Sequence, residues 1–169
     1  MKKYRKPMQI AILLVFVLVG GITVASALSN DAEAPPTEGQ IAPDFSVAGL
    51  DGQTYRLSDF RGRHVVLNFW GSFCDPCVRE MPLLQQIYEH YADEGVVVLG
   101  VNLDESLATV RSFVRSVDVN FPILLDHGKI QKRYGVIYYP TTFVIGPDGK
   151  IAHKKVGEIT DMRQVAAYF

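Results

Sequence analysis

Apolar residues follow two different patterns along the chain. Near the amino terminus they form one nearly continuous run, residues 8–28, which is about long enough to cross a membrane as a helix. From Ile41 onward, short runs rich in Val, Ile and Phe alternate with stretches whose apolar positions recur every three or four residues. The short runs predict β-strands and the recurring positions predict amphipathic helices, so we expect a mixed α/β sheet.

The predicted elements alternate in a regular order with no internal repeat. The predicted strands are residues 45–47, 54–56, 64–70, 96–101, 121–125, 141–145 and 151–155, and the predicted helices are residues 76–91, 107–117, 129–134 and a last helix capped by Thr160. Two successive strand–helix–strand units predict a parallel core. Turn residues at Asp51-Gly52 and at residues 147–150 predict two antiparallel hairpins.

The amino-terminal run is preceded by a basic cluster, Lys2, Lys3, Arg5 and Lys6. Basic residues flanking a membrane helix stay in the cytoplasm, so residues 1–28 predict a basic tip and a transmembrane anchor. The remaining chain is then extracytoplasmic, and the protein is a single-pass protein of the cell membrane. The small residues 25–27 leave an alternative open, because signal peptidase cuts after such a pattern and would release the chain after Ala27.

Residues 29–40 are polar and contain Pro35 and Pro36, which predicts a linker. We therefore expect one folded domain over residues 41–169. The chain has 169 residues, 48% hydrophobic and 21% charged, a composition typical of globular proteins. Four of its 17 basic residues lie in the first six positions, whereas the 18 acidic residues all follow residue 28. This acidic body argues against a nucleic-acid-binding surface.

The sharpest chemical feature is the pair of cysteines, Cys74 and Cys77, between a predicted strand and a predicted helix. Two cysteines at this spacing can reach disulfide distance in the first helical turn. Unpaired N–H groups at the helix start stabilise a thiolate on Cys74, which predicts Cys74 as the nucleophile and Cys77 as the resolving thiol. Pro76 fits the first turn, where its missing N–H is not needed.

Other interpretations of the cysteine pair are weaker. A structural disulfide that closes so short a loop constrains little chain entropy. A structural zinc site needs four ligands, and the sequence offers no second cysteine pair. The four histidines are scattered, so we expect no metal centre. Gly20-Gly21 lies in the apolar run and not in a strand-to-helix phosphate loop, so we expect no nucleotide site, and no cofactor beyond a redox-active Cys74–Cys77 disulfide.

Residues 68–77 (NFWGSFCDPC), 79–82 (REMP) and 139–143 (YPTTF) together resemble the membrane-anchored thioredoxin-like thiol-disulfide oxidoreductases of cytochrome c maturation, the ResA/TlpA family. The resemblance covers the basic tip, the anchor and essentially all of residues 41–169. It implies a thioredoxin-like fold with an N-terminal β-hairpin and an inserted βα unit at residues 96–126. It also implies a cis peptide at Tyr139-Pro140, packed against the disulfide.

The resemblance implies further site residues. Glu80 is expected beside the cysteines, where a carboxylate raises cysteine pKa values and can relay a proton, although it can also be a solvated surface residue. The expected substrate-binding residues are Phe73, Asp75, Pro76, Tyr139, Pro140 and Thr141. Two of them depart from the family pattern, since Phe73 stands where Trp is usual and Asp75 where the closest relatives have Glu. Tyr138 is a further candidate contact.

The implied function is reduction of a disulfide in an exported protein, with the haem-attachment cysteines of apocytochrome c as the expected client. Electrons would come from a membrane thiol carrier of the CcdA/DsbD type. The same chemistry on a cell-wall or sporulation protein stays an alternative. A thiol peroxidase is less favoured, because Leu67 and Gly71 replace its Pro and Thr, and so is copper delivery, which would require His127 or His153.

Overall fold

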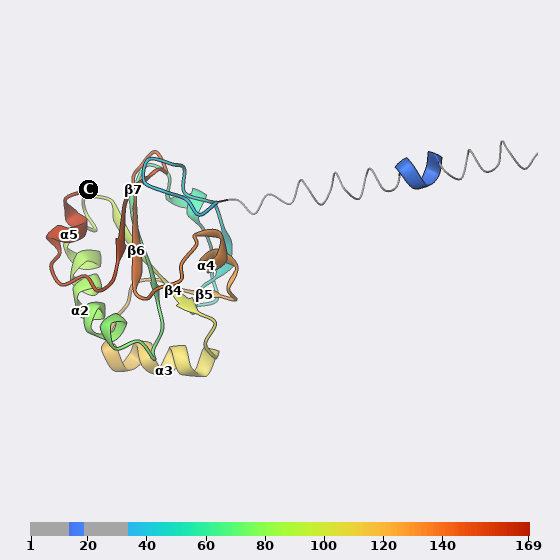
Figure 1. The fold of residues 1–169 in the computed structure, drawn as a ribbon. Coiled ribbons are helices and arrows are strands. Elements are labelled where there is room, and N and C mark those ends of the chain that lie inside the picture. Colours follow the sequence, from blue (N-terminus) through green and yellow to red (C-terminus); the bar gives the residue numbers. More distant parts are fainter. Residues whose placement is uncertain (1–13, 19–33) are drawn as a thin grey trace, which may run out of the picture. The chain divides into compact units, whose positions relative to one another are not determined.

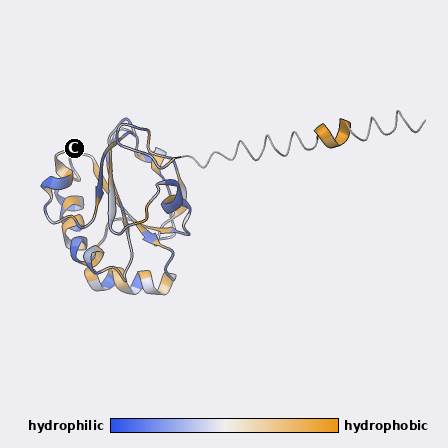
Figure 2. Cartoon of the chain, viewed as in Figure 1, coloured by the Kyte–Doolittle hydropathy of each residue, from blue (hydrophilic) through white to orange (hydrophobic). Residues whose placement is uncertain are grey.

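The computed structural model describes residues 14–18 and 34–169, and it divides the chain into two compact units, Met1–Ala34 and Pro35–Phe169. In the first unit, residues 14–18 form a short apolar helix (Figure 2). Within the described ranges, no helix is long and apolar enough to span a membrane. Most of the predicted anchor, residues 8–28, lies outside the described residues, so the anchor stays a prediction.

The second unit is built around a five-stranded sheet in the order β5-β4-β3-β6-β7 (Figure 1). The strands are β3 (His64–Trp70), β4 (Val96–Leu103), β5 (Ile123–Asp126), β6 (Thr141–Ile145) and β7 (Ile151–Val156). The first three are parallel, while β6 and β7 are antiparallel to their neighbours. This arrangement confirms the predicted parallel core with an antiparallel hairpin at its edge.

Alternating residues of β3 supply two separate cores. Val65, Leu67 and Phe69 belong to the core that also contains Ile130 of the short helix α4 (Lys129–Arg133). Val66 and Trp70 belong to the core on the opposite face. Because successive side chains of a strand point to opposite faces, a continuous apolar run is what a central strand covered on both sides requires.

The helices complete these two layers. The second core contains buried residues of α2 (Asp75–His90), α3 (Leu107–Val117) and α5 (Arg163–Ala166). Figure 1 shows α2 and α5 on one side of the sheet and α4 on the other. Phe69 and Trp70 are both fully buried, so these two aromatic residues of the motif belong to the core.

The N-terminal hairpin consists of β1 (Ser46–Ala48) and β2 (Thr54–Arg56), followed by the 3-10 helix η1 (Leu57–Phe60). The hairpin contacts the outer strand, because the Leu50 N–H donates to the Ile123 carbonyl at 2.8 Å. The β4–α3–β5 segment supplies that outer strand. The structure thus contains both additions that the resemblance implies.

Most element boundaries agree with the sequence expectations to within two residues, and the larger differences concern the start of the domain and the last helix. The compact unit begins at Pro35, and the backbones of Gly39 and Gln40 are hydrogen-bonded to Ile151, so the end of the predicted linker packs on β7. Strand β5 begins only at Ile123. The prediction that Thr160 caps the last helix is wrong. Helix α5 has no side-chain cap, and Asp161 instead accepts a hydrogen bond from the Arg163 N–H at 2.9 Å.

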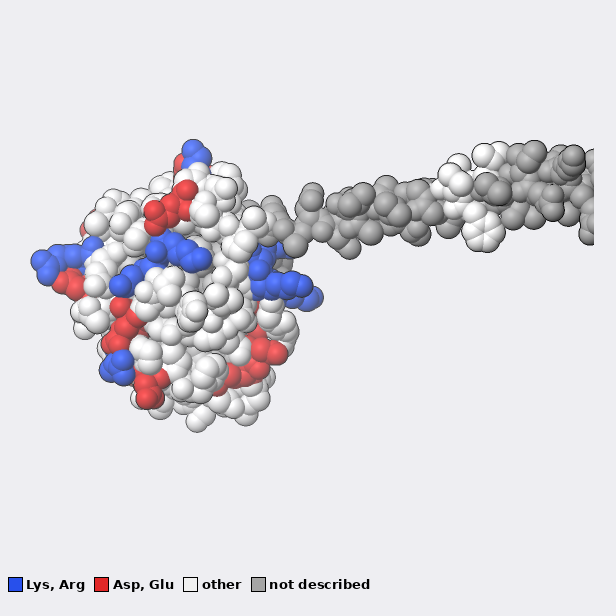
Figure 3. All heavy atoms as spheres, in the orientation of Figure 1, with Lys and Arg blue, Asp and Glu red and all other residues white. Residues whose placement is uncertain are grey.

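The visible surface has mixed charge. Figure 3 shows Lys and Arg side chains interspersed with Asp and Glu over this face of the described residues. Such a face offers no continuous basic strip for a phosphate backbone.

Candidate active site

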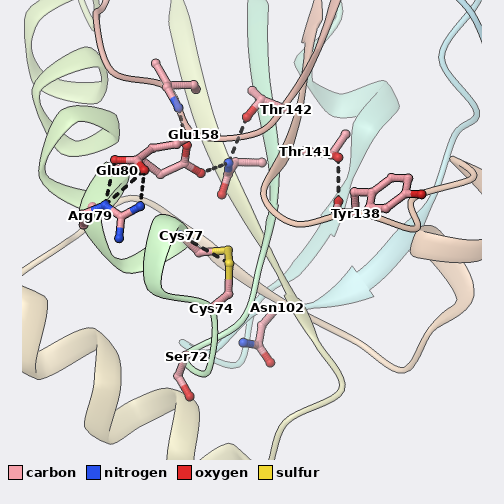
Figure 4. Close-up of a disulfide and its surroundings, with 12 residues drawn as sticks. Ser72, Cys74, Cys77, Arg79, Glu80, Asn102, Tyr138, Thr141, Thr142 and Glu158 are labelled. Atoms are coloured by element: carbon pink, nitrogen blue, oxygen red, sulfur yellow. Dashed lines mark hydrogen bonds and ion pairs between the residues drawn. A yellow bond between two sulfur atoms is a disulfide. The ribbon is translucent and has the colours of Figure 1, made fainter.

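The two cysteines form a disulfide at the start of α2 (Figure 4), with their Cα atoms 5.2 Å apart. Cys74 is the N-cap residue of the helix and Cys77 lies in its first turn. Their exposure differs, because Cys74 is half-buried and Cys77 is fully buried. A sulfur atom of another molecule can therefore reach Cys74 but not Cys77.

The helix start also favours negative charge on Cys74. The Cys77 N–H donates a hydrogen bond to the Cys74 Sγ atom at 3.3 Å. This donor and the positive end of the helix dipole both stabilise a thiolate at that position. Pro76 lies in the first helical turn and removes no needed N–H group. This geometry favours Cys74 as the nucleophile and Cys77 as the resolving thiol, and both roles stay predictions.

Glu80 lies one turn further along α2 and is only 1% exposed, so the interpretation as a solvated surface residue is excluded. Its Oε1 atom accepts a hydrogen bond from Asn68 Nδ2 at 2.7 Å, and its Oε2 atom accepts one from the Ile159 N–H at 2.8 Å. Burial raises the pKa of Glu80 to about 7, although the two hydrogen bonds favour the charged form. Glu80 can therefore gain or lose a proton near neutral pH.

The sequence prediction missed the partners of Glu80. Asn68 on β3 also donates to Thr142 Oγ1 on β6 at 2.9 Å, so Asn68 links the Glu80 carboxylate to β6. Within residues 34–169, Asn68 Oδ1 has no hydrogen-bond partner. One signal in the sequence could have revealed Asn68, since it is the only polar residue between Val65 and Trp70 in a buried strand.

Phe73 and Asp75 flank Cys74 and are exposed. The Phe73 side chain is 65% exposed, and its ring lies against Gly71, where an added Cβ would come within 2.5 Å of Phe73 Cε1. Glycine is thus required at position 71 for this ring placement. Asp75 begins α2. Both predicted contact residues are accessible to a client.

The second sequence motif forms a turn before β6, and its Tyr139-Pro140 peptide is cis, as the resemblance implies. Thr141 Oγ1 donates to the Tyr138 carbonyl at 2.7 Å, and the Gly157 N–H donates to the Pro140 carbonyl at 2.8 Å. Figure 4 includes this turn in the surroundings of the disulfide. Packing of Pro140 directly on the disulfide stays a prediction.

The two tyrosines of this turn differ. Tyr138 is 66% exposed, whereas Tyr139 is partly buried against both cores and its hydroxyl accepts a hydrogen bond from Gln131. Within residues 34–169, the backbone N–H and C=O groups of Tyr139 have no backbone partner. Tyr138 therefore has an accessible side chain, whereas what Tyr139 leaves without a partner in this range is its main chain.

Residues 34–169 contain no cluster of three or more His, Cys, Asp or Glu side chains that could hold a metal ion. The two histidines considered for copper each have another partner. His127 Nδ1 is 3.0 Å from Asp104 Oδ1, and His153 Nδ1 is 2.8 Å from Glu38 Oε1.

Residues 39–154 match the model of the AhpC/TSA family. The chain belongs to this family. Among its relatives, the thiol-disulfide oxidoreductase ResA of Bacillus thuringiensis subsp. konkukian is 39% identical over 161 residues, which cover 95% of this chain and 92% of the relative. ResA of Bacillus subtilis is 38% identical and covers 95% of this chain and 89% of its own.

The solved structures agree with these relatives. A crystal structure of a DsbE-type thiol:disulfide interchange protein from Chlorobium tepidum has a TM-score of 0.74 and 33% sequence identity, and it covers 79% of this chain and 95% of its own. The fold is therefore thioredoxin-like. Together with the Cys74–Cys77 disulfide, the relatives establish this family member as a protein thiol-disulfide oxidoreductase.

Proposed function

We propose that this protein reduces disulfides of exported proteins outside the cytoplasm, and that its client is apocytochrome c, at the paired haem-attachment cysteines. One observation supports the chemistry most directly: an accessible Cys74 at a helix start is bonded to a fully buried Cys77. The choice of client rests on the motif resemblance.

The reaction begins with the reduced protein. The Cys74 thiolate attacks one sulfur of the client disulfide, and the other client sulfur leaves as a thiolate, which produces a mixed disulfide on Cys74. The Cys77 thiolate then attacks the Cys74 sulfur, and the second client sulfur leaves. Two electrons pass from the cysteine pair to the client, and the protein ends with the Cys74–Cys77 disulfide.

Glu80 is the group to which we assign the proton transfer. Cys77 must lose a proton before it can attack, and Glu80 lies three residues later on the same helical face. Because burial raises the pKa of Glu80 to about 7, this carboxylate accepts a proton at neutral pH and can release it again. A solvent-exposed glutamate with an ordinary pKa would be a weaker base.

The acidic neighbours favour the reductase direction. Glu80 follows Cys77 by one turn, and Asp75 is the residue next to Cys74. Negative charge beside a thiol disfavours its thiolate, so the reduced state holds its electrons less tightly. The pair should then donate electrons more readily than a pair without acidic neighbours.

The proposed location follows from the basic cluster and the apolar run of residues 8–28. A tether at the membrane keeps the cysteine pair near a membrane thiol carrier of the CcdA/DsbD type, which we propose as its electron source. Tethering raises the effective concentration of both partners.

The client surface combines apolar side chains with free main-chain groups. Phe73, Ile137 and Tyr138 are all well exposed, and they lie within the first site motif or directly before the second. The unpaired main chain of Tyr139 can bind an extended client strand by β-augmentation. We therefore expect the protein to prefer a disulfide that lies in an unfolded, partly apolar segment.

A trapping experiment tests this proposal. In Cys77→Ala, a disulfide-bonded peptide with the haem-attachment pattern C-x-x-C-H should remain attached to Cys74, as mapped by mass spectrometry. Cys74→Ala is the matched control and should form no adduct. Absence of any adduct on Cys74 would contradict the mechanism. If a peptide of the same composition in scrambled order forms the Cys74 adduct at an equal rate, apocytochrome c is not supported as the client. That result would support another exported protein, such as a cell-wall or sporulation protein.

A further inference from the structure

The carboxylate of Glu105 joins the β4–α3 loop to the segment that carries the disulfide. It accepts three hydrogen bonds. The Ser72 N–H donates to Oε2 at 2.8 Å, the Ser72 hydroxyl donates to Oε1 at 2.5 Å, and Asn102 Nδ2 donates to Oε2 at 2.8 Å. Charge-assisted hydrogen bonds of this kind are the strong ones, and two of them act on one residue.

Glu105 is itself held in place. Its N–H donates to Asn102 Oδ1 at 3.2 Å, and Asn102 is a buried residue of β4 whose register partner is Trp70 on β3. The next residue, Ser106, caps α3 by accepting a hydrogen bond from the Thr109 N–H. The position of the Glu105 carboxylate is therefore fixed relative to the sheet through Asn102.

Ser72 lies inside the turn that leads into α2. The Cys74 N–H donates to the Gly71 carbonyl at 3.2 Å, which closes the turn around Ser72 and Phe73. Within residues 34–169, Ser72 and Phe73 make no hydrogen bond to the rest of the protein except those to Glu105. Figure 4 shows Ser72 and Asn102 among the surroundings of the disulfide.

We propose that Glu105 is a positioning residue of the redox centre, which acts through Ser72 to hold the turn of residues 71–74. With the turn fixed, the Cys74 Sγ atom stays where the Cys77 N–H reaches it, and the Phe73 ring stays on Gly71. Glu105 needs no contact with the sulfur atoms for this role. The proposal rests on the proposed role of Cys74 as the attacking thiol.

The substitution Glu105→Asp tests position separately from charge. Aspartate keeps the negative charge but is shorter by one methylene, so it cannot hold Asn102 and both Ser72 groups from the same backbone position. In the reduced full-length protein, we expect the rate of Cys74 alkylation at pH 7 to fall by about tenfold, because misplacement of roughly 1 Å can cost up to about 100-fold in rate. The pH midpoint of alkylation should shift upward, since the thiolate loses the Cys77 N–H.

Two further variants complete the test. Ser72→Ala removes only the hydroxyl bond and should shift the alkylation profile in the same direction by a smaller amount, about threefold in rate. Ser106→Ala is the matched control, because it removes the α3 cap one residue away without affecting Ser72. It should leave the alkylation profile unchanged, whatever it does to stability.

The outcomes are separable. Wild-type-like rate and pH midpoint in folded Glu105→Asp would overturn the proposal, and so would an equal shift in Ser106→Ala, which would show a merely structural role. If Glu105→Asp fails to fold, Ser72→Ala decides by itself, and an unchanged profile there overturns the proposal. If wild-type Cys74 is no more reactive than Cys77, the proposed role of Cys74 fails instead.

Discussion

Replacement of Glu80 by Gln removes a buried group whose charged form the fold disfavours. The pKa of Glu80 rises from 4.5 to about 7, and a rise of about 2.5 units corresponds to about 3 kcal/mol. The folded protein binds the Glu80 proton more tightly than the unfolded chain does. The stabilisation that comes from this protonation is therefore fully present below pH 4.5 and is lost as the pH rises through 7. Between pH 4.5 and 8, the unfolding free energy of the wild-type protein should therefore fall by about 3 kcal/mol relative to that of Glu80→Gln.

The surroundings of Glu80 can accept the new amide. Both Glu80 oxygens accept hydrogen bonds, so an NH₂ group in place of one oxygen would face a donor from either Asn68 or Ile159. A rotation of the Asn68 amide by about 180° removes the conflict with Asn68. Its Oδ1 atom has no partner among the described residues, and after the rotation it can accept from the new NH₂ group and from the Thr142 hydroxyl. We therefore expect Glu80→Gln to fold.

The assay is urea unfolding of the oxidised fragment 35–169, the compact unit, at pH 4.5 and pH 8. The difference in unfolding free energy between wild type and Glu80→Gln is compared at the two pH values. The contributions of the other titrating groups are the same in both proteins and cancel in this difference. A difference that changes by less than about 0.5 kcal/mol, the size of an ordinary surface effect, would refute the assignment of a raised pKa to Glu80.

Other substitutions test the client surface and the core. Phe73→Ala should slow the reduction of a peptide disulfide by about three- to tenfold because an exposed aromatic contact is lost, while the rate with oxidised glutathione stays within about twofold. Equal slowing of both substrates would place Phe73 in the chemistry instead. Gly100→Ala should lower the unfolding free energy by about 1–3 kcal/mol, because a Cβ would lie 3.0 Å from Ile123, Phe121 and Trp70 atoms. An unchanged urea midpoint would show that these neighbours move aside.

The strands and long helices could be predicted from the sequence because their patterns have no close competitor. The run 64–70 is short, nearly continuously apolar and contains two adjacent valines, which favours a buried strand over a helix, and α2 repeats its apolar positions over four turns. Boundaries that depend on backbone pairing were harder. Residues 35–40 are polar, yet Gly39 and Gln40 pair with Ile151, and hydropathy carries no information on such bonds.

The cysteines and the Tyr139-Pro140 turn were predictable because their motifs are local. The network around Glu80 was not, since Asn68, Thr142 and Ile159 lie 12 to 79 residues away from their partners along the chain. The same holds for Glu105, which is 33 residues from Ser72. Only the folded sheet brings these residues together, and one chain without a fold gives no signal for the pairs.

Equilibration of fragment 35–169 against dithiothreitol and glutathione tests the central claim most directly. We expect one reversible two-electron transition that requires both Cys74 and Cys77, at a potential well below the value of about −180 mV typical of protein disulfide isomerase. A potential near the value of about −120 mV of a strong oxidant, or the absence of a reversible transition, would contradict it.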